Sequence, residues 1–167
     1  MPWGVLAGAV LLVYLLQTAV VGLLGWSWLD LFLMLTLLVA LLAPLHDARI
    51  AGWLIGFAQD LGSTDAVGIH AFTLGLACLL LTSIRGILNL RVWWSRLLVV
   101  FLCAWPAPFL YALHLRFWAG ADTVGASDII LGSAAHALLA AAIATVLTAW
   151  PTLRFRRRRA GGYGANA

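Results

Sequence analysis

The chain is a succession of long apolar runs separated by short polar joints. The runs predict membrane-spanning helices over about 3–24, 29–43, 50–61, 68–84, 97–115 and 128–150. They are continuously apolar, whereas strands of outer-membrane barrels alternate between apolar and polar residues over about ten positions. We therefore expect an all-α integral membrane protein with six transmembrane helices, forming a single domain over residues 1–151.

Composition supports this class of protein. The 167 residues are 64% hydrophobic and only 10% charged, whereas soluble domains carry roughly 25% charged residues. Both cysteines, Cys78 and Cys103, lie inside apolar runs. We expect them to behave as small buried hydrophobic residues and not to form a disulfide.

The third run, 50–61, is shorter than the ~20 residues that cross a bilayer upright. The distribution of arginines nevertheless supports a crossing there. With six spans, one side of the membrane receives nearly every arginine: Arg49, Arg85, Arg91, Arg96, Arg154 and Arg156–Arg159, leaving Arg116 on the other side. The positive-inside rule then predicts that both termini are cytoplasmic.

The chain ends in a basic tail, residues 152–167, which we expect to be disordered and cytoplasmic. Its positive charge has two interpretations, fixing the topology or contacting anionic lipid. Nucleic-acid binding is a poor interpretation, because the cluster is isolated and tethered to the membrane. The residues concerned are Arg154, Arg156, Arg157, Arg158 and Arg159.

The stretch 50–72 differs from the plain apolar runs around it. Gly52 and Gly56 are four residues apart, a spacing that lets a second helix approach closely. Asp60 follows on a similar helical face, and Gly68 and His70 open the next run. The pattern predicts a tight helix contact that leads to a polar corner at the outer face.

Asp60 and His70 have a structural and a chemical interpretation. Asp60 can brace the loop by accepting hydrogen bonds, or the pair can form an acid–base dyad with shifted pKa values. No nucleophile or third member is visible nearby, so we favour the structural role and expect no enzymatic activity. On that interpretation Asp60→Asn, which keeps one acceptor, retains much of the function.

The histidines give no sign of a metal site or of any other cofactor. They lie in different segments, without the close helical spacing that a pair of metal ligands often shows: His46, His70, His114 and His136. We expect His136 to be hydrogen-bonded to a neighbouring helix.

Pro106 and Pro108 lie in the middle of the fifth predicted span. Each removes an amide donor and crowds the carbonyl four residues earlier, which predicts a kink or an unwound turn. Such a break either shapes the packing of the bundle or lines a binding site, as it does in transporters.

The residues Gly52, Gly56, Gln59, Asp60, Gly68 and His70 resemble the rod shape-determining protein MreD family. That family has a Gly-rich short span with an Asp at its end, a loop, and Gly-x-His opening the next span. The likeness is specific over about 50–71 and loose elsewhere. One departure is the loop 62–67, which lacks the family's usual Ser-Gly and Pro-Leu.

The resemblance implies a non-enzymatic scaffold for bacterial cell elongation and peptidoglycan synthesis. Such proteins are multi-pass proteins of the inner membrane that bind MreC, and they are linked indirectly to MreB and to RodA with its penicillin-binding protein. Gly52, Gly56, Asp60, Gly68 and His70 are then candidates for structural or partner contacts.

The MreD fold is similar to that of the substrate-binding subunits of energy-coupling-factor vitamin transporters, which gives a second interpretation. Those subunits usually dock through an Ala-x-x-x-Ala face on the first helix, where this chain has Gly4 and Gly8. They also need a polar pocket under the outer loops, for which the sequence offers few candidate residues. We therefore expect a scaffold in preference to a transporter subunit.

Overall fold

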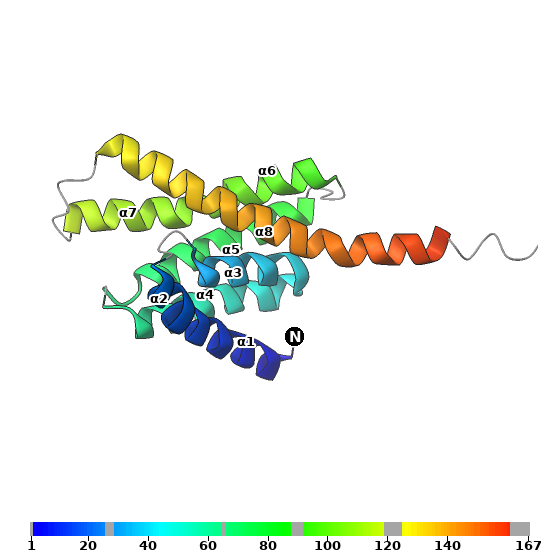
Figure 1. Ribbon diagram of the computed structural model, residues 1–167, viewed down its shortest axis with the longest axis horizontal. Helices are drawn as coiled ribbons and strands as arrows, with labels where there is room; N and C mark the ends of the chain where they lie inside the picture. The colour runs from blue at the N-terminus through cyan, green and yellow to red at the C-terminus, as the bar shows by residue number, and fades with distance from the viewer. Residues whose placement is uncertain (1, 26–28, 65, 88–91, 119–124, 161–167) are drawn as a thin grey trace, which may run out of the picture.

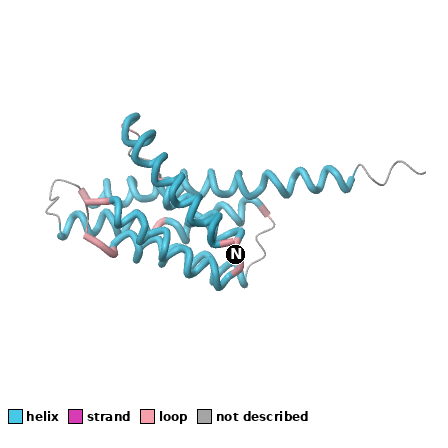
Figure 2. The backbone as a smooth tube through the Cα atoms, turned by 90° about the horizontal axis from the view of Figure 1, so that it is seen from below, coloured by secondary structure: helices cyan, strands magenta, loops and turns pink. Residues whose placement is uncertain are grey.

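The computed structural model describes residues 2–25, 29–64, 66–87, 92–118 and 125–160, and every regular element among them is a helix. Figure 1 shows a bundle with α1 at one edge and α6, α7 and α8 at the opposite edge. Viewed at right angles, the described backbone is mostly helix, with short loops between the helices (Figure 2). The all-α class expected from the apolar runs is confirmed for the described residues.

The first two predicted spans lie close to their expected limits. The first contains α1 (Trp3–Leu16), a π-helical turn η1 (Gln17–Val21) and α2 (Gly22–Leu24). The second is α3 (Leu31–Leu42), whose N-cap is Asp30. The Asp30 carboxylate accepts hydrogen bonds from the amides of Phe32 and Leu33 at 2.9 and 3.0 Å, so it satisfies donors that the helix leaves free.

The third predicted span is longer than the apolar run that marks it. Helix α4 covers Leu45–Gly62, so it takes in residues 45–49 of the polar segment that separates the second and third apolar runs. At about 1.5 Å per residue its 18 residues extend roughly 27 Å, close to the ~30 Å of a hydrocarbon core. Counting apolar residues alone therefore underestimated this helix.

The fourth and fifth predicted spans also extend beyond their apolar runs. Helix α5 covers Ile69–Ile87, and the fifth span consists of α6 (Trp93–Ala104) and α7 (Pro106–Trp118). The break between α6 and α7 falls at Trp105, directly before Pro106. Proline is well suited to that first helical position, because its missing amide would have had no partner there.

Helix α8 (Ala126–Ala160) differs most from its expected limits. It does not end at 150 but continues through the arginine-rich segment, so residues 152–160 of the tail that we expected to be disordered are helical. The remainder of the tail, 161–167, lies outside the described residues, as does Arg91. Figure 1 shows the end of α8 projecting beyond the bundle.

Membrane-crossing length is confirmed for only part of the chain. Two helical stretches of the described residues, Trp93–Trp118 and Ala126–Ala149, are long and apolar enough to cross a bilayer. Three further apolar helices are shorter: Trp3–Ala19, Leu31–Leu42 and Ile69–Arg85. The arrangement with six spans therefore stays a prediction.

Arginines hold one end of the bundle together. The guanidinium of Arg85 donates to the carbonyls of Ala40 and Ala43 at 2.6 and 2.7 Å, at the C-terminal end of α3. A cation is stabilising there, because the last carbonyls of a helix have no partner within it and carry partial negative charge. Arg49 reaches from α4 to the hydroxyl of Thr82 at 3.3 Å.

The closest packing is between α4 and α5, which run antiparallel. A Cβ added at Gly52 would lie 2.5 Å from the Cβ of Cys78, and one added at Gly56 would lie 2.6 Å from the Cα of Ala71. Neither position has room for a side chain. The two glycines therefore allow the backbones to approach, as the spacing predicted.

Replacement of Gly56 by alanine should destabilise the fold. The added methyl group meets backbone that cannot turn aside, and overpacking costs about 1–3 kcal/mol. Gly8→Ala is the matched control, because nothing lies within 4 Å of a Cβ there and alanine favours a helix by about 0.8–1 kcal/mol over glycine. Thermal unfolding in detergent should show a lower Tm for Gly56→Ala and an unchanged or higher Tm for Gly8→Ala. Equal Tm values would contradict the close contact.

Candidate functional site

Asp60 forms the corner between α4 and α5. Its side chain is buried, with the whole residue 2% exposed. One carboxylate oxygen accepts from the amide and the ring Nδ1 of His70, at 2.9 and 3.0 Å. The other oxygen accepts from the amides of Gly68 and Ala71, at 2.9 and 3.0 Å. The carboxylate therefore caps the start of α5 from the end of α4.

Gly68 allows the loop to reach this carboxylate. Its φ of +103° lies in a region that residues with a Cβ rarely adopt. In this conformation the Gly68 amide points to Asp60, and its carbonyl accepts from the amide of Phe72 in the first turn of α5. The Gly-x-His spacing thus combines a required backbone conformation with two anchoring contacts.

His70 is oriented by the same carboxylate. A neutral imidazole that donates from Nδ1 to Asp60 has Nε2 as an acceptor. The other side of the ring lies against Tyr111 of α7, with ring centroids 4.8 Å apart. His70 therefore links the corner to a third helix.

The contacts around Asp60 favour bracing over acid–base chemistry. Both oxygens already accept two hydrogen bonds each, which leaves little capacity to take up a proton from a substrate. Two hydroxyl groups near the corner are also engaged: Ser63 donates to the carbonyl of Asp60, and Thr73 donates to the carbonyl of His70. The arrangement is that of a helix cap reinforced by an imidazole.

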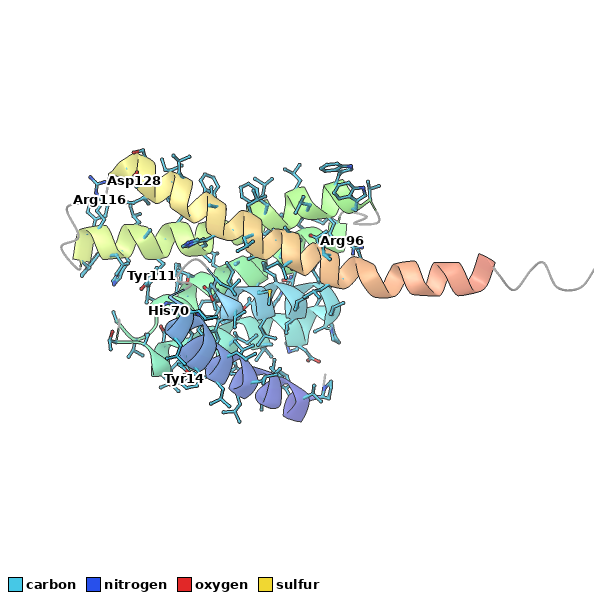
Figure 3. The ribbon with its side chains drawn as sticks, viewed as in Figure 1. Tyr14, His70, Arg96, Tyr111, Arg116 and Asp128 are labelled. Carbon is cyan, nitrogen blue, oxygen red and sulfur yellow. The ribbon has the colours of Figure 1, made fainter. Side chains whose placement is uncertain are left out.

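A cavity of about 420 Å³ opens beside the corner. From the first half of the chain its wall receives Gln17, Asp30, Gln59, His70 and Thr73. From the second half it receives Pro108, Tyr111, Arg116, Asp128, Ser133 and His136. In Figure 3, His70, Tyr111, Arg116 and Asp128 lie toward one end of the bundle and Arg96 toward the other.

This cavity corrects one expectation from the sequence. We expected few residues for a polar pocket, but the fold gathers isolated polar residues from six different helices or helix ends. The signal in the sequence was weak but present. In the predicted arrangement with six spans, Asp30 and Asp128 both lie near the outer face.

Several cavity residues also hold the helices in register. The Gln17 amide donates to the carbonyl of Leu29 at 3.1 Å and accepts from the amide of Leu31 at 3.0 Å. The indole of Trp105 donates to the hydroxyl of Ser133 at 3.0 Å, which ties the α6–α7 break to α8. Pro108, on the next turn, lines the cavity itself.

Apart from His136, the remaining candidate residues do not line this cavity. His114 stacks on Trp118, and His46 is exposed in the first turn of α4. His136 lines the cavity. Cys78 and Cys103 are free and buried. Among the described residues, no group of three or more His, Cys, Asp or Glu side chains is placed to hold a metal ion.

Comparisons with protein-family models, with curated proteins and with solved structures find no match for this chain.

The geometry changes the expected effect of Asp60→Asn. An asparagine replaces one acceptor oxygen by an NH2 group that faces two donors, so two of the four hydrogen bonds are lost. Hydrogen bonds to charged groups contribute about 1.5–3 kcal/mol each. Asp60→Asn should therefore unfold at a clearly lower temperature than wild type, with Asp60→Leu lower still.

Asp47→Asn, at the start of α4, is the control for loss of a carboxylate, and thermal unfolding of all three variants is the measurement. If Asp60→Asn keeps the wild-type Tm but loses function, the bracing role is wrong and a chemical role for Asp60 must be considered.

Proposed function

We propose that this protein is a non-enzymatic membrane scaffold of the bacterial cell-elongation machinery, similar to the MreD family, and that it binds MreC. The observation that carries the proposal is structural: most of the residues that resemble the MreD family make contacts that hold α4 and α5 together. Gly52 and Gly56 provide helix contact, while Asp60, Gly68 and His70 build the α4–α5 corner. Because these contacts brace the fold, the motif suits a scaffold better than an enzyme.

In this proposal the chain is a multi-pass protein of the inner membrane, with six spans and both termini cytoplasmic. Its apolar outer surface supports a lipid environment, since large side chains such as Leu11, Leu131 and Val146 are 60%, 68% and 61% exposed. The two ends of the bundle also differ in charge. Arg49, Arg85 and Arg96 lie at the end opposite the Asp60 corner.

The proposed partners follow from the resemblance. MreC is the direct partner. MreB, RodA and its penicillin-binding protein are indirect partners. Arg154 and Arg156–Arg159 belong to the C-terminal part of α8. In this proposal they meet anionic lipid at the cytoplasmic surface, because a basic cluster next to a span attracts negatively charged head groups.

A second candidate function is a substrate-binding membrane subunit of a transporter for a vitamin or another small molecule. The cavity of about 420 Å³ favours it, because ligand pockets typically measure 300–1,000 Å³. The first helix supports it less. Gly4 and Gly8 leave open space on α1, where the transporter subunits usually carry an alanine pair.

The topology can be tested with single cysteines. Thr64 and His46 are exposed at opposite ends of α4, and both native cysteines are buried. Thr64→Cys should react with a membrane-impermeant maleimide in intact spheroplasts, whereas His46→Cys should react only after permeabilisation. Labelling of His46→Cys in intact spheroplasts would show that the proposed orientation is wrong.

The scaffold role predicts a stable complex with MreC. The tagged chain should retain MreC through detergent extraction, and should not retain an unrelated bitopic protein expressed at the same level. Mass spectrometry of the purified complex would detect MreC and any bound small molecule together. Retention of a vitamin in a one-to-one ratio, with no MreC, would favour the transporter function instead.

A further inference from the structure

The cavity beside the Asp60 corner has a wall that is rich in hydrogen-bond acceptors. It is formed by the ends of helices from both halves of the chain, so a ligand there would contact several helices at once. Its lining combines polar groups with an aromatic ring, that of Tyr111. This mixture of apolar surface and a few polar groups is typical of small-ligand sites.

Three acceptors in this wall come from separate elements. Asp30 uses one carboxylate oxygen to cap α3, and its second oxygen makes none of the described cap contacts. His70 is held by Asp60 through Nδ1, which makes Nε2 an acceptor in the neutral ring. Gln59 has an Oε1 atom that is buried and accepts no hydrogen bond from the described residues. Gln59 also lines the cavity.

The charges in the wall also favour a positive ligand. Two carboxylates, Asp30 and Asp128, line the cavity with one guanidinium, that of Arg116. A carboxylate in a partly desolvated site near the membrane is costly unless a cation or hydrogen-bond donors compensate it.

We propose that this cavity binds a primary ammonium group, whose N–H donors are shared among Asp30, Gln59 and His70. A quaternary ammonium group carries the same charge but has no N–H, and would leave the acceptors unpaired. The ammonium group can belong to the head group of a phospholipid such as phosphatidylethanolamine or to a free small amine. The site does not depend on binding of MreC, so it can be tested with the full-length chain alone.

The lipid source can be tested by native mass spectrometry of the full-length chain. The protein is exchanged into mixtures of phosphatidylethanolamine, phosphatidylcholine and phosphatidylglycerol with the same acyl chains. One molecule of phosphatidylethanolamine should be retained at least tenfold in preference to the other two. The free source is tested by thermal unfolding with ethanolamine phosphate and, as control, choline phosphate, in lipid-free detergent. Stabilisation by the first compound alone would show that the free amine is sufficient.

Variants separate the site from general effects on folding. Asp30→Asn keeps an N-cap of nearly equal strength and removes only the charge, and Gln59→Met keeps the side-chain volume. Each should reduce the preference for the primary amine by about tenfold, a change equivalent to one hydrogen bond to a charged group. Asp47→Asn, a carboxylate outside the cavity, should leave the preference unchanged.

Two results would overturn the proposal. One is equal retention of the three lipids together with equal thermal stabilisation by ethanolamine phosphate and choline phosphate. The other is wild-type preference in both Asp30→Asn and Gln59→Met. Neither result bears on the scaffold role, which is decided by copurification with MreC.

Discussion

The structure depends on one buried carboxylate with four donors around it. Asp60 joins the last turn of α4 to the first turn of α5, and a carboxylate is the side chain that can accept from three amides and an imidazole together. Gly52 and Gly56 extend the same contact along both helices by removing side chains from the seam. The corner fixes where the two helices meet, and the seam fixes how closely they pack.

The cavity follows from this corner. Because Asp60 holds the ring of His70, that ring faces Tyr111 of α7 and becomes part of the cavity wall. Gln59 directly precedes Asp60 on α4, so the position of the corner also puts Gln59 in the cavity wall. A structural motif and a candidate binding site therefore share residues, so variants of the motif are expected to disturb both. Variants of Asp30 avoid this overlap, since Asp30 lies outside the α4–α5 corner and its carboxylate accepts from amides of α3.

Arginines have a structural role in addition to the topological role that the sequence predicts for them. Arg85 is an important example, because its guanidinium donates to two carbonyls at the end of α3 and so connects α3 to α5. In sequence it was one of many positive charges on one side. In the fold its guanidinium supplies hydrogen-bond donors to carbonyls at the end of α3, which have no partner within that helix. Hydrogen bonds to the Asp60 carboxylate therefore connect helices at one end of the bundle. Hydrogen bonds from the guanidinium groups of Arg49 and Arg85 connect helices at the other end.

The sequence by itself determined the helical class, the approximate positions of the helices and the closeness of α4 to α5, because apolar runs and glycine spacing act locally. It also singled out Asp60 and His70, since an ionisable residue near a span needs a partner. Only the tertiary structure decided the length of α4, the continuation of α8 to Ala160 and the polar cavity. Helix ends depend on capping and packing partners. A cavity depends on which polar residues, far apart in the chain, meet across the bundle.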